Sequence, residues 1–375
     1  MTLHITDAFD GGNIRVLDAS DPQNIRLEIK KDHQSDFYQW FYFRVTGEAG
    51  TDLKIVIENA GGAAYTGGWK DYRAVISYDL NDWTRTETSY DGKALTVETK
   101  MRRNTLWVAY FAPYTEERHQ ALISGAQGSG LAKVSVLGET LDGRPLDLIT
   151  IGDPDSDKPV FWITARQHPG ETMAQWWMEG FLERLLDPTD ELALKLLDQV
   201  TLNIVPNMNP DGSARGHLRT NAVGTNLNRE WQTPTLEKSP EVYHVLNKMR
   251  ETGCALALDV HGDEALPYNF IAGAEGIPRW NDAMAADLAA FKHAYVQSTG
   301  GVFQTKYGYP ISQPGTANLN ICTNALAEEF GCLAMTLEMP FKDDANHPDG
   351  MRGWSPAACK HLGANAIEPL LKAVP

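Results

Sequence analysis

The stretch VFWITARQHPGE, from Val160 to Glu171, places two potential metal ligands directly after a short apolar run. The run at 160–165 is rich in β-branched and aromatic residues, which predicts a buried strand. The next segment, Thr172 to Leu186, carries large apolar residues at near-helical spacing and predicts a helix with one packed face. His168 and Glu171 therefore lie in a strand-to-helix turn, where both side chains can face one point. An H-x-x-E spacing is common by chance, so the rest of the chain must support a metal site.

Length, charge and cysteine usage limit the classes of protein that this chain can belong to. Its 375 residues, 42% of them hydrophobic, predict two or three folded domains. The net charge of −16 disfavours nucleic acid or anionic membrane as a partner, because a phosphate surface attracts basic proteins. The four cysteines form no C-x-x-C pair, and we expect them to be reduced and mostly buried, as in a cytoplasmic protein.

No targeting or membrane segment is evident in the sequence. The residues after Met1 lack a basic stretch followed by an apolar one, so no signal peptide is expected. No uncharged apolar run is long enough to cross a bilayer. We therefore expect a cytoplasmic protein without a membrane partner.

Residues 1–113 predict an antiparallel β-sandwich domain. Short runs of alternating or aromatic and β-branched character are separated by turn residues such as Asp91-Gly92, without helical patterns between them. The predicted strands are 14–17, 25–29, 40–45, 53–57, 74–78, 94–99 and 106–111.

Residues 114–375 predict a second domain of α/β class, in which helices cover a mixed, mostly parallel sheet. Its strands are near-continuous apolar runs that alternate with helical patterns, as in sheets buried on both faces. The predicted strands are 134–137, 146–151, 160–165, 200–205, 255–260 and 333–337, and the predicted helices are 115–124, 172–186, 240–252, 278–298 and 355–373.

Chemically active residues follow four of these strands. His168 and Glu171 follow the first, the segment 207–212 follows the second, His261 follows the third, and Glu338 follows the fourth. In parallel sheets, ligands bind beyond the carboxyl ends of the strands, so we expect these residues to meet there.

Together these residues make up a hydrolytic metal site. His168, Glu171 and His261 would bind one zinc ion per chain and leave a coordination position for water. Glu338 would act as general base, and its apolar neighbours would raise its pKa. An ion-paired structural role for Glu338 is the alternative.

A cluster of polar donors lies between the ligands in the sequence: Arg215, Arg219, Asn228 and Arg229. Asn228 and Arg229 could bind a substrate carboxylate, and Arg219 could stabilise the oxyanion at the attacked carbonyl. Without a zinc site, the same residues would indicate a solvated polar loop.

As an ordered set, these motifs resemble those of zinc metallocarboxypeptidases of the carboxypeptidase A type. The matching segments are His168–Glu171, Asn209–Gly212, Arg219, Asn228–Trp231, Asp259–Gly262 and Thr336–Glu338. The runs Gln39–Val45 and Ala112–Thr115 resemble the amino-terminal β-domain of the cytosolic carboxypeptidase subfamily. The resemblance covers nearly the whole chain. It implies removal of carboxyl-terminal residues from peptides or protein tails, which in some relatives are acidic.

Two features of the site are not accounted for by these motifs: the catalytic tyrosine of relatives and the side-chain preference. Relatives carry a mobile tyrosine shortly before the catalytic glutamate, but no tyrosine occurs here between Pro310 and Glu338. Tyr307 and Tyr309, just before this gap, match that position only loosely and are not predicted to be catalytic. No motif defines the side-chain preference. An acidic preference would need a cation in the pocket, for which Arg279, Lys292 and Lys306 lie in the right part of the chain, although their residue types favour a solvated surface position for each.

The sequence therefore predicts a cytoplasmic zinc carboxypeptidase. Two alternatives remain at this stage. One is an aspartoacylase-like amidohydrolase of N-acyl amino acids, which would share the H-x-x-E motif and the later histidine. The other is a catalytically inactive peptide-binding module that keeps the fold.

Overall fold

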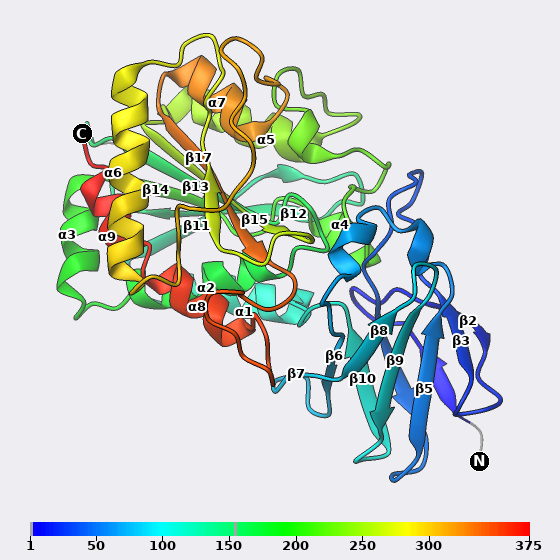
Figure 1. Ribbon diagram of the computed structural model, residues 1–375. Helices are drawn as coiled ribbons and strands as arrows, with labels where there is room; N and C mark the ends of the chain where they lie inside the picture. Colours follow the sequence, from blue (N-terminus) through cyan, green and yellow to red (C-terminus); the bar gives the residue numbers. More distant parts are fainter. Residues whose placement is uncertain (1–2, 154–155) are drawn as a thin grey trace.

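The computed structural model describes residues 3–153 and 156–375, and Figure 1 shows a β-sandwich beside a larger α/β part. The sandwich strands are β1 (His4–Thr6), β2 (Arg15–Asp18), β3 (Ile25–Glu28), β4 (Tyr42–Thr46), β5 (Asp52–Ile57), β6 (Val75–Ser77), β7 (Thr84–Arg85), β8 (Glu87–Tyr90), β9 (Leu95–Lys100) and β10 (Thr105–Ala109). The short 3₁₀ helices η1 (Ala60–Gly62) and η2 (Thr66–Trp69) connect β5 to β6.

The sandwich consists of two five-stranded sheets, in the orders β1-β4-β10-β6-β7 and β2-β3-β5-β9-β8. Burial alternates along the strands: Leu53, Ile55 and Ile57 of β5 are buried, and the residues between them are not. This period of two is what a sheet with one covered face requires. The predicted antiparallel sandwich is confirmed, with the pair β3 and β5 running parallel. The short strands β1, β7 and β8 were not predicted.

The α/β part contains one seven-stranded sheet in the order β11-β12-β14-β13-β15-β17-β16. Its strands are β11 (Ala132–Glu139), β12 (Pro145–Ile151), β13 (Val160–Ala165), β14 (Thr201–Val205), β15 (Leu256–Asp263), β16 (Phe270–Ala272) and β17 (Leu333–Pro340). The four strands β14, β13, β15 and β17 are parallel, and antiparallel strands lie on either side of them. The predicted mixed, mostly parallel sheet is confirmed.

Helices cover both faces of this sheet (Figure 1). They are α1 (Glu116–Gly128), α2 (Met173–Leu185), α3 (Glu191–Gln199), α4 (Pro210–Arg215), α5 (Pro240–Thr252), α6 (Asp282–Ser298), α7 (Cys322–Phe330), α8 (Pro356–Ala364) and α9 (Ile367–Lys372), with the 3₁₀ helix η3 (Leu227–Arg229). Within β13, Phe161 and Ile163 pack into the core that contains α2, and Trp162 packs into the core that contains α5 and α7. A strand buried on both faces therefore reads as a continuous apolar run.

The single closing helix predicted for residues 355–373 is wrong, because the structure breaks it into α8 and α9. Pro369 has no N–H to donate to the Asn365 carbonyl four residues earlier. That carbonyl instead accepts a hydrogen bond from the Ser298 hydroxyl at 2.8 Å. The helix predicted from residue 278 begins at Asp282, because the Asn281 side chain caps its first turn.

The sandwich and the α/β part share one apolar core. The ring of Tyr110 stacks on that of Phe341 at 4.7 Å, and the Trp176 indole donates a hydrogen bond to the Ala112 carbonyl at 3.0 Å. Arg85 of β7 forms an ion pair with Asp343 at 3.1 Å. The predicted domain boundary near residue 113 stays a prediction, since packing is continuous across it.

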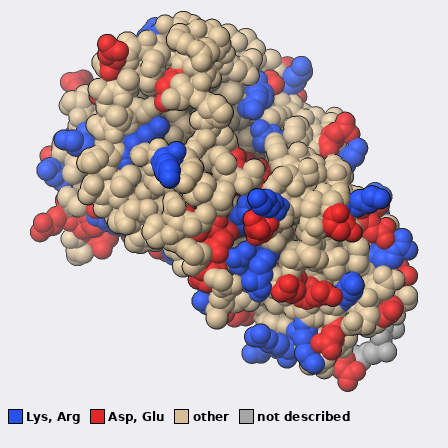
Figure 2. Space-filling view, viewed as in Figure 1, with Lys and Arg blue, Asp and Glu red and all other residues tan. Residues whose placement is uncertain are grey.

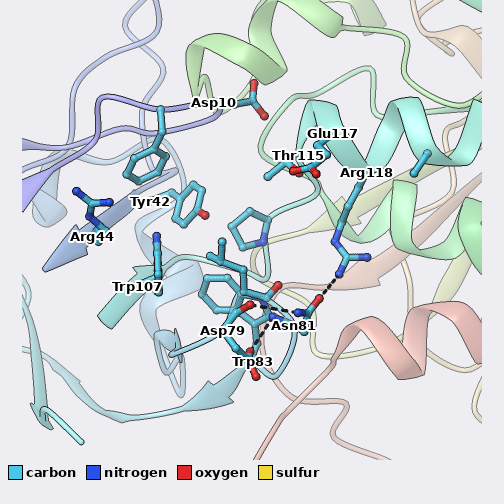
Figure 3. A pocket seen from close by; sticks show the side chains of 14 residues that line it. Asp10, Tyr42, Arg44, Asp79, Asn81, Trp83, Trp107, Thr115, Glu117 and Arg118 are labelled. Carbon is cyan, nitrogen blue, oxygen red and sulfur yellow. Dashed lines mark hydrogen bonds between the residues drawn. The ribbon is translucent and has the colours of Figure 1, made fainter. Parts of the chain in front are cut away.

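A cavity of about 620 Å³ lies at this junction, between the sandwich and α1 (Figure 3). Aromatic side chains of Tyr42, Trp83 and Trp107 line one part of it, and Arg118 of α1 donates a hydrogen bond to Asn81 at 2.8 Å across another. Its lining differs from that of the cleft described below.

The cysteines are buried, as the sequence predicts, and the charges on the visible face (Figure 2) are mixed in sign. On the face shown in Figure 2, basic and acidic side chains are interspersed and no single basic patch stands out. All four cysteines are buried and none forms a disulfide. Among the described residues, no helix has both the length and the apolar character that a bilayer crossing requires.

Candidate active site

The strand register brings the predicted site residues to one edge of the sheet. His261 on β15 lies directly opposite Glu338 on β17, and β13 pairs with β15 up to Ala165 and Val260. The turn after β13 then carries His168 and Glu171 over the same edge. Parallel strands with matched ends therefore gather ligands that are far apart in the sequence.

His168, Glu171 and His261 form a buried cluster whose potential ligand atoms all lie within 4.8 Å of one another. Nδ1 of His168 is 2.6 Å from Oε1 of Glu171, and Nδ1 of His261 is 2.8 Å from Oε2. The two Nδ1 atoms are 3.2 Å apart. These are the three residues that the sequence predicts as metal ligands.

The outer ring nitrogens both have acceptor partners, so the neutral form of each imidazole presents the lone pair of Nδ1 to the centre of the cluster. Nε2 of His261 lies 2.7 Å from a carboxylate oxygen of Asp259, and Nε2 of His168 lies 3.1 Å from the side-chain oxygen of Asn226. Because both of these oxygens accept, each Nε2 must donate. Two lone pairs and a carboxylate then converge on one point, which is the donor set of a catalytic divalent metal, with outer partners that orient the histidines.

Burial and nearby charges act differently on the two histidines. Burial, together with the guanidinium of Arg219, lowers the pKa of His168 to about 4, so this imidazole is neutral at pH 7. Burial also lowers the pKa of His261, but the carboxylates of Asp259 and Glu171 outweigh it and hold that pKa well above the ordinary value. Without a metal this imidazole therefore keeps a proton on Nδ1, which a bound metal would displace. Burial raises the pKa of Glu171, but the two imidazoles outweigh this and hold it below the usual range.

The motif at 207–212 supports the cluster from outside it. The side-chain amide of Asn209 donates to the Gln167 carbonyl at 3.0 Å and its oxygen accepts from the Gly212 N–H at 3.0 Å. The Gln167 side chain in turn accepts from the Trp231 indole at 2.8 Å and donates to Asp259. These bonds fix the turn that carries His168.

Glu338 lies beside the cluster with a hydrogen-bonding atom unused. Burial, supported by the charges of Glu171 and Asp263, holds the pKa of Glu338 well above its usual range, although His261 opposes this. Its Oε2 is buried and finds no partner among the described residues, and its Oε1 accepts from the Tyr309 hydroxyl at 3.1 Å. An ion-paired structural role is therefore not supported.

A cleft of about 720 Å³ opens over the cluster and contains three of the four predicted donors, Arg219, Asn228 and Arg229. Oδ1 of Asn228 accepts from the Cys322 N–H at 2.9 Å. Among the ion pairs of the described residues, none involves Arg219 or Arg229, so two guanidinium groups line the cleft without a carboxylate partner. Arg215 does not join them, because it pairs with Asp142 at 2.7 Å outside the cleft.

The structure adds cleft residues that the sequence did not single out as site residues. The Tyr309 hydroxyl lies 2.6 Å from a carboxylate oxygen of Asp263 and 3.1 Å from one of Glu338, whereas Tyr307 stacks on Tyr268. Tyr65 of the sandwich and Glu264 also line the cleft. The only sequence signal for Tyr309 was its place before Glu338, and nothing in the pattern marked Tyr65.

Of the three candidate cations, the cleft lining includes Lys292 and Lys306 and leaves out Arg279. Burial lowers the pKa of Lys292, while Glu275 opposes this. Lys306 is exposed beside the ring of Tyr307. Lys292 is thus the half-buried cation in the cleft wall.

A mostly parallel sheet with a His-Glu-His cluster, a buried base and two free guanidinium groups at one edge defines a metal-dependent hydrolase. Comparison with known proteins identifies the family. Residues 124–352 match the zinc carboxypeptidase family, and residues 5–111 match the cytosolic carboxypeptidase N-terminal domain.

Relatives and solved structures agree with these matches. A protein of Zymomonas mobilis is 49% identical over 100% of this chain and 97% of its own length. The metallo-carboxypeptidase structure from Burkholderia cenocepacia has a TM-score of 0.96 at 45% identity, covering 100% of this chain and 99% of its own. The Pseudomonas aeruginosa metallo-carboxypeptidase, in complex with (2-guanidinoethylmercapto)succinic acid, has a TM-score of 0.95 at 42% identity, covering 98% of each chain.

The animal relatives are longer. Cytosolic carboxypeptidase 3 of Bos taurus is 26% identical over 74% of this chain, which spans only 31% of that protein.

The chain therefore belongs to the zinc carboxypeptidase family and carries the amino-terminal domain of cytosolic carboxypeptidases. It is a metallocarboxypeptidase, a hydrolase of peptide bonds, and the family implies a catalytic metal. The amidohydrolase and the inactive module lose their support at this point.

Proposed function

We propose that this protein uses one zinc ion, held by His168, Glu171 and His261, to remove carboxyl-terminal residues from peptides or protein tails. The convergence of two imidazole lone pairs and a carboxylate, beside a buried base, is the observation that carries the proposal. A set of two histidines and one glutamate with an open position suits catalytic zinc. When bound there, zinc would polarise the scissile carbonyl and lower the pKa of water.

The substrate's terminal carboxylate docks on Arg229 and Asn228. Arg229 has no carboxylate partner among the described residues, and its own N–H group donates to the Asn228 carbonyl at 2.6 Å, which orients the guanidinium. A bidentate pair with a planar carboxylate then defines where the chain of the substrate ends.

Glu338 and Arg219 act at the scissile bond, by proton transfer and by charge stabilisation respectively. Glu338 takes a proton from the attacking water through its unpaired Oε2 and passes it to the leaving amine. A raised pKa suits this shuttle, because the carboxyl must both accept and release the proton. Arg219 stabilises the negative charge that develops on the carbonyl oxygen. Tyr309, hydrogen-bonded to Glu338, orients the base.

An acidic residue at the cleaved position is the side-chain preference that we propose, with Lys292 as its partner. Lys292 lies in the cleft wall without an ion-pair partner among the described residues, and desolvation strengthens its attraction for an anion. Glu275 in the same wall limits this effect. We also propose that the protein is cytoplasmic and that its partners are flexible carboxyl-terminal tails, with neither nucleic acid nor membrane among them.

The test is mass spectrometry of zinc-loaded protein with peptides that differ only in their last residue. We expect loss of single carboxyl-terminal residues, fastest for Glu or Asp, and no cleavage of the same peptides as carboxyl-terminal amides. Lys292→Gln should slow cleavage of the Glu peptide but not of a Leu peptide, and Lys133→Gln on the surface serves as control. Hydrolysis of N-acyl amino acids with intact peptides would refute the proposal.

A further inference from the structure

The loop between β3 and β4 of the sandwich carries a buried carboxylate, Asp32, into the catalytic part. Its side chain, 3% exposed, accepts three successive backbone N–H groups: those of Leu218 at 2.7 Å, Arg219 at 2.8 Å and Thr220 at 2.9 Å. The Thr220 hydroxyl adds a fourth bond at 3.0 Å. Charge-assisted bonds to consecutive peptide groups fix both the position and the direction of this turn.

The side chain of Arg219 is also held from the sandwich side. Its Cζ lies 5.5 Å from the ring centre of Phe37 and 5.6 Å from that of Tyr65. Tyr65 is fixed in turn by Gln39, whose amide exchanges two hydrogen bonds with the Tyr65 backbone at 2.8 and 3.0 Å. Aromatic faces attract the guanidinium without neutralising its charge.

The same turn contacts the loop of the metal cluster. The Leu218 carbonyl accepts from the Gly170 N–H at 2.8 Å, and a Cβ added to Gly170 would lie only 2.9 Å from that oxygen. On the other side, Nε2 of His217 accepts from the His33 N–H at 3.1 Å, so its Nδ1 donates to the Thr220 carbonyl at 2.9 Å. Contacts from the sandwich thus reach the His168–Glu171 loop through residues 217–220.

We propose that Asp32, Phe37 and Tyr65 are positioning residues for Arg219, so that the amino-terminal domain supplies part of the catalytic site. The inference rests on the proposed function, in which Arg219 stabilises the charge on the scissile carbonyl. Asp32 binds the backbone of Arg219 and not its guanidinium, and therefore aims this cation without cancelling the charge that the reaction uses.

A double-mutant cycle tests the coupling between Asp32 and Arg219. The variants Asp32→Asn, Arg219→Gln and the double variant are assayed on the peptide that the wild-type protein cleaves fastest. Asn keeps the size of Asp32 but offers one acceptor oxygen where the carboxylate offered two. We expect Asp32→Asn to lower kcat about 10- to 100-fold, with KM nearly unchanged, since removing an oxyanion donor outright costs about 10²–10³. The double variant should be no slower than Arg219→Gln alone.

Losses that multiply in the double variant would overturn the inference, because they would mean that Asp32 acts independently of Arg219. An Arg219→Gln variant with wild-type kcat would instead remove Arg219 from the mechanism, which is a failure of the proposed function and is visible in the single variant. Asp36→Asn is the matched control, because Asp36 lies in the same loop and undergoes the same chemical change, but its side chain is 97% exposed. It should behave as wild type.

Hydrogen exchange gives a readout that is independent of turnover. In the full-length protein with Asp32→Asn, the amides of 218–220 should exchange at least about tenfold faster, while those of β13 and β15 keep their protection. Unchanged exchange at 218–220 would overturn the inference. If Asp32→Asn fails to fold, Phe37→Leu leaves the carboxylate in place and removes one ring face. It should lower kcat about two- to fivefold in the wild-type background and have no effect with Arg219→Gln.

Discussion

The two sides of the cleft are built in different ways. On one side, the proposed metal ligands His168, Glu171 and His261 are held by neighbours such as Asp259, two residues from His261 on the same strand. On the other, the turn 217–220 is held by Asp32 and His33, which come from the amino-terminal sandwich. The difference teaches that the metal side takes direct support from the α/β part and only indirect support from the sandwich, through Leu218 and Gly170, whereas the Arg219 side is held by the sandwich directly.

The sharpest way to break the metal side is to remove its base without disturbing its ligands. Glu338→Gln should leave the metal bound and lower kcat about 10²–10⁴-fold, because the amide cannot accept the proton of water. Metal content and turnover are measured on the same sample. Turnover near the wild-type level would remove Glu338 from the mechanism.

The second prediction concerns the pH dependence of the protein's stability. It rests on Glu241, which lies beside the loop that follows the turn 217–220. Burial raises the pKa of Glu241 to about 8, and this carboxyl faces the amide of Asn221, whose oxygen accepts from the Val223 and Thr225 N–H groups. The folded state therefore holds a proton that the unfolded chain releases above its ordinary pKa. The stability that this group contributes is complete at low pH and is lost as the pH rises through 8.

Glu241→Gln should therefore be more stable than wild type at pH 9, by about 2–5 kcal/mol, with the difference shrinking towards pH 4.5. Urea unfolding monitored by circular dichroism at pH 5, 7 and 9 gives the comparison. A variant whose advantage did not grow with pH would show that Glu241 is ionised in the folded state.

Arg229→Ala sharpens the comparison within the cleft. Loss of the carboxylate anchor should raise KM about 10- to 100-fold for peptides with a free terminus and change kcat less. Steady-state kinetics with Arg250→Ala as control separate this from a general loss of positive charge, since Arg250 pairs with Glu329 at the surface. A fall in kcat alone would contradict the anchor role.

The smallest effect is expected at Tyr309. Tyr309→Phe removes the hydroxyl that bonds to Glu338 and Asp263, and kcat should fall about five- to tenfold, as for loss of a single hydrogen bond. Tyr243→Phe, at an exposed position on α5, is the control. An unchanged kcat would mean that these contacts do not orient the base.

The sequence predicted the sandwich, the mostly parallel sheet and the clustering of the three potential metal ligands, because each rests on a local pattern. His168 and Glu171 share one strand-to-helix turn, and His261 follows an apolar strand. Tyr309 could not be assigned because it lies on an irregular segment that only tertiary packing brings to Glu338. Asp32, Phe37 and Tyr65 carry no local signal at all, since their partner Arg219 is far along the chain. The sequence placed Arg215 among the site donors wrongly for the same reason. Its ion-pair partner, Asp142, lies far away in the sequence, in the turn of the β11–β12 hairpin.

The strand order also determines when the site can form during synthesis. β17 lies between β15 and β16, although it is the last strand of the sheet in the sequence, and it carries Glu338. Since chains emerge from the ribosome amino-terminal end first, Asp32, both histidines and Arg229 are all synthesised before Glu338. Because β16 joins the sheet only through β17, the pairing of β17 with β15 completes both this edge of the sheet and the proposed catalytic site. A chain whose synthesis has not passed residue 338 lacks the base that we propose.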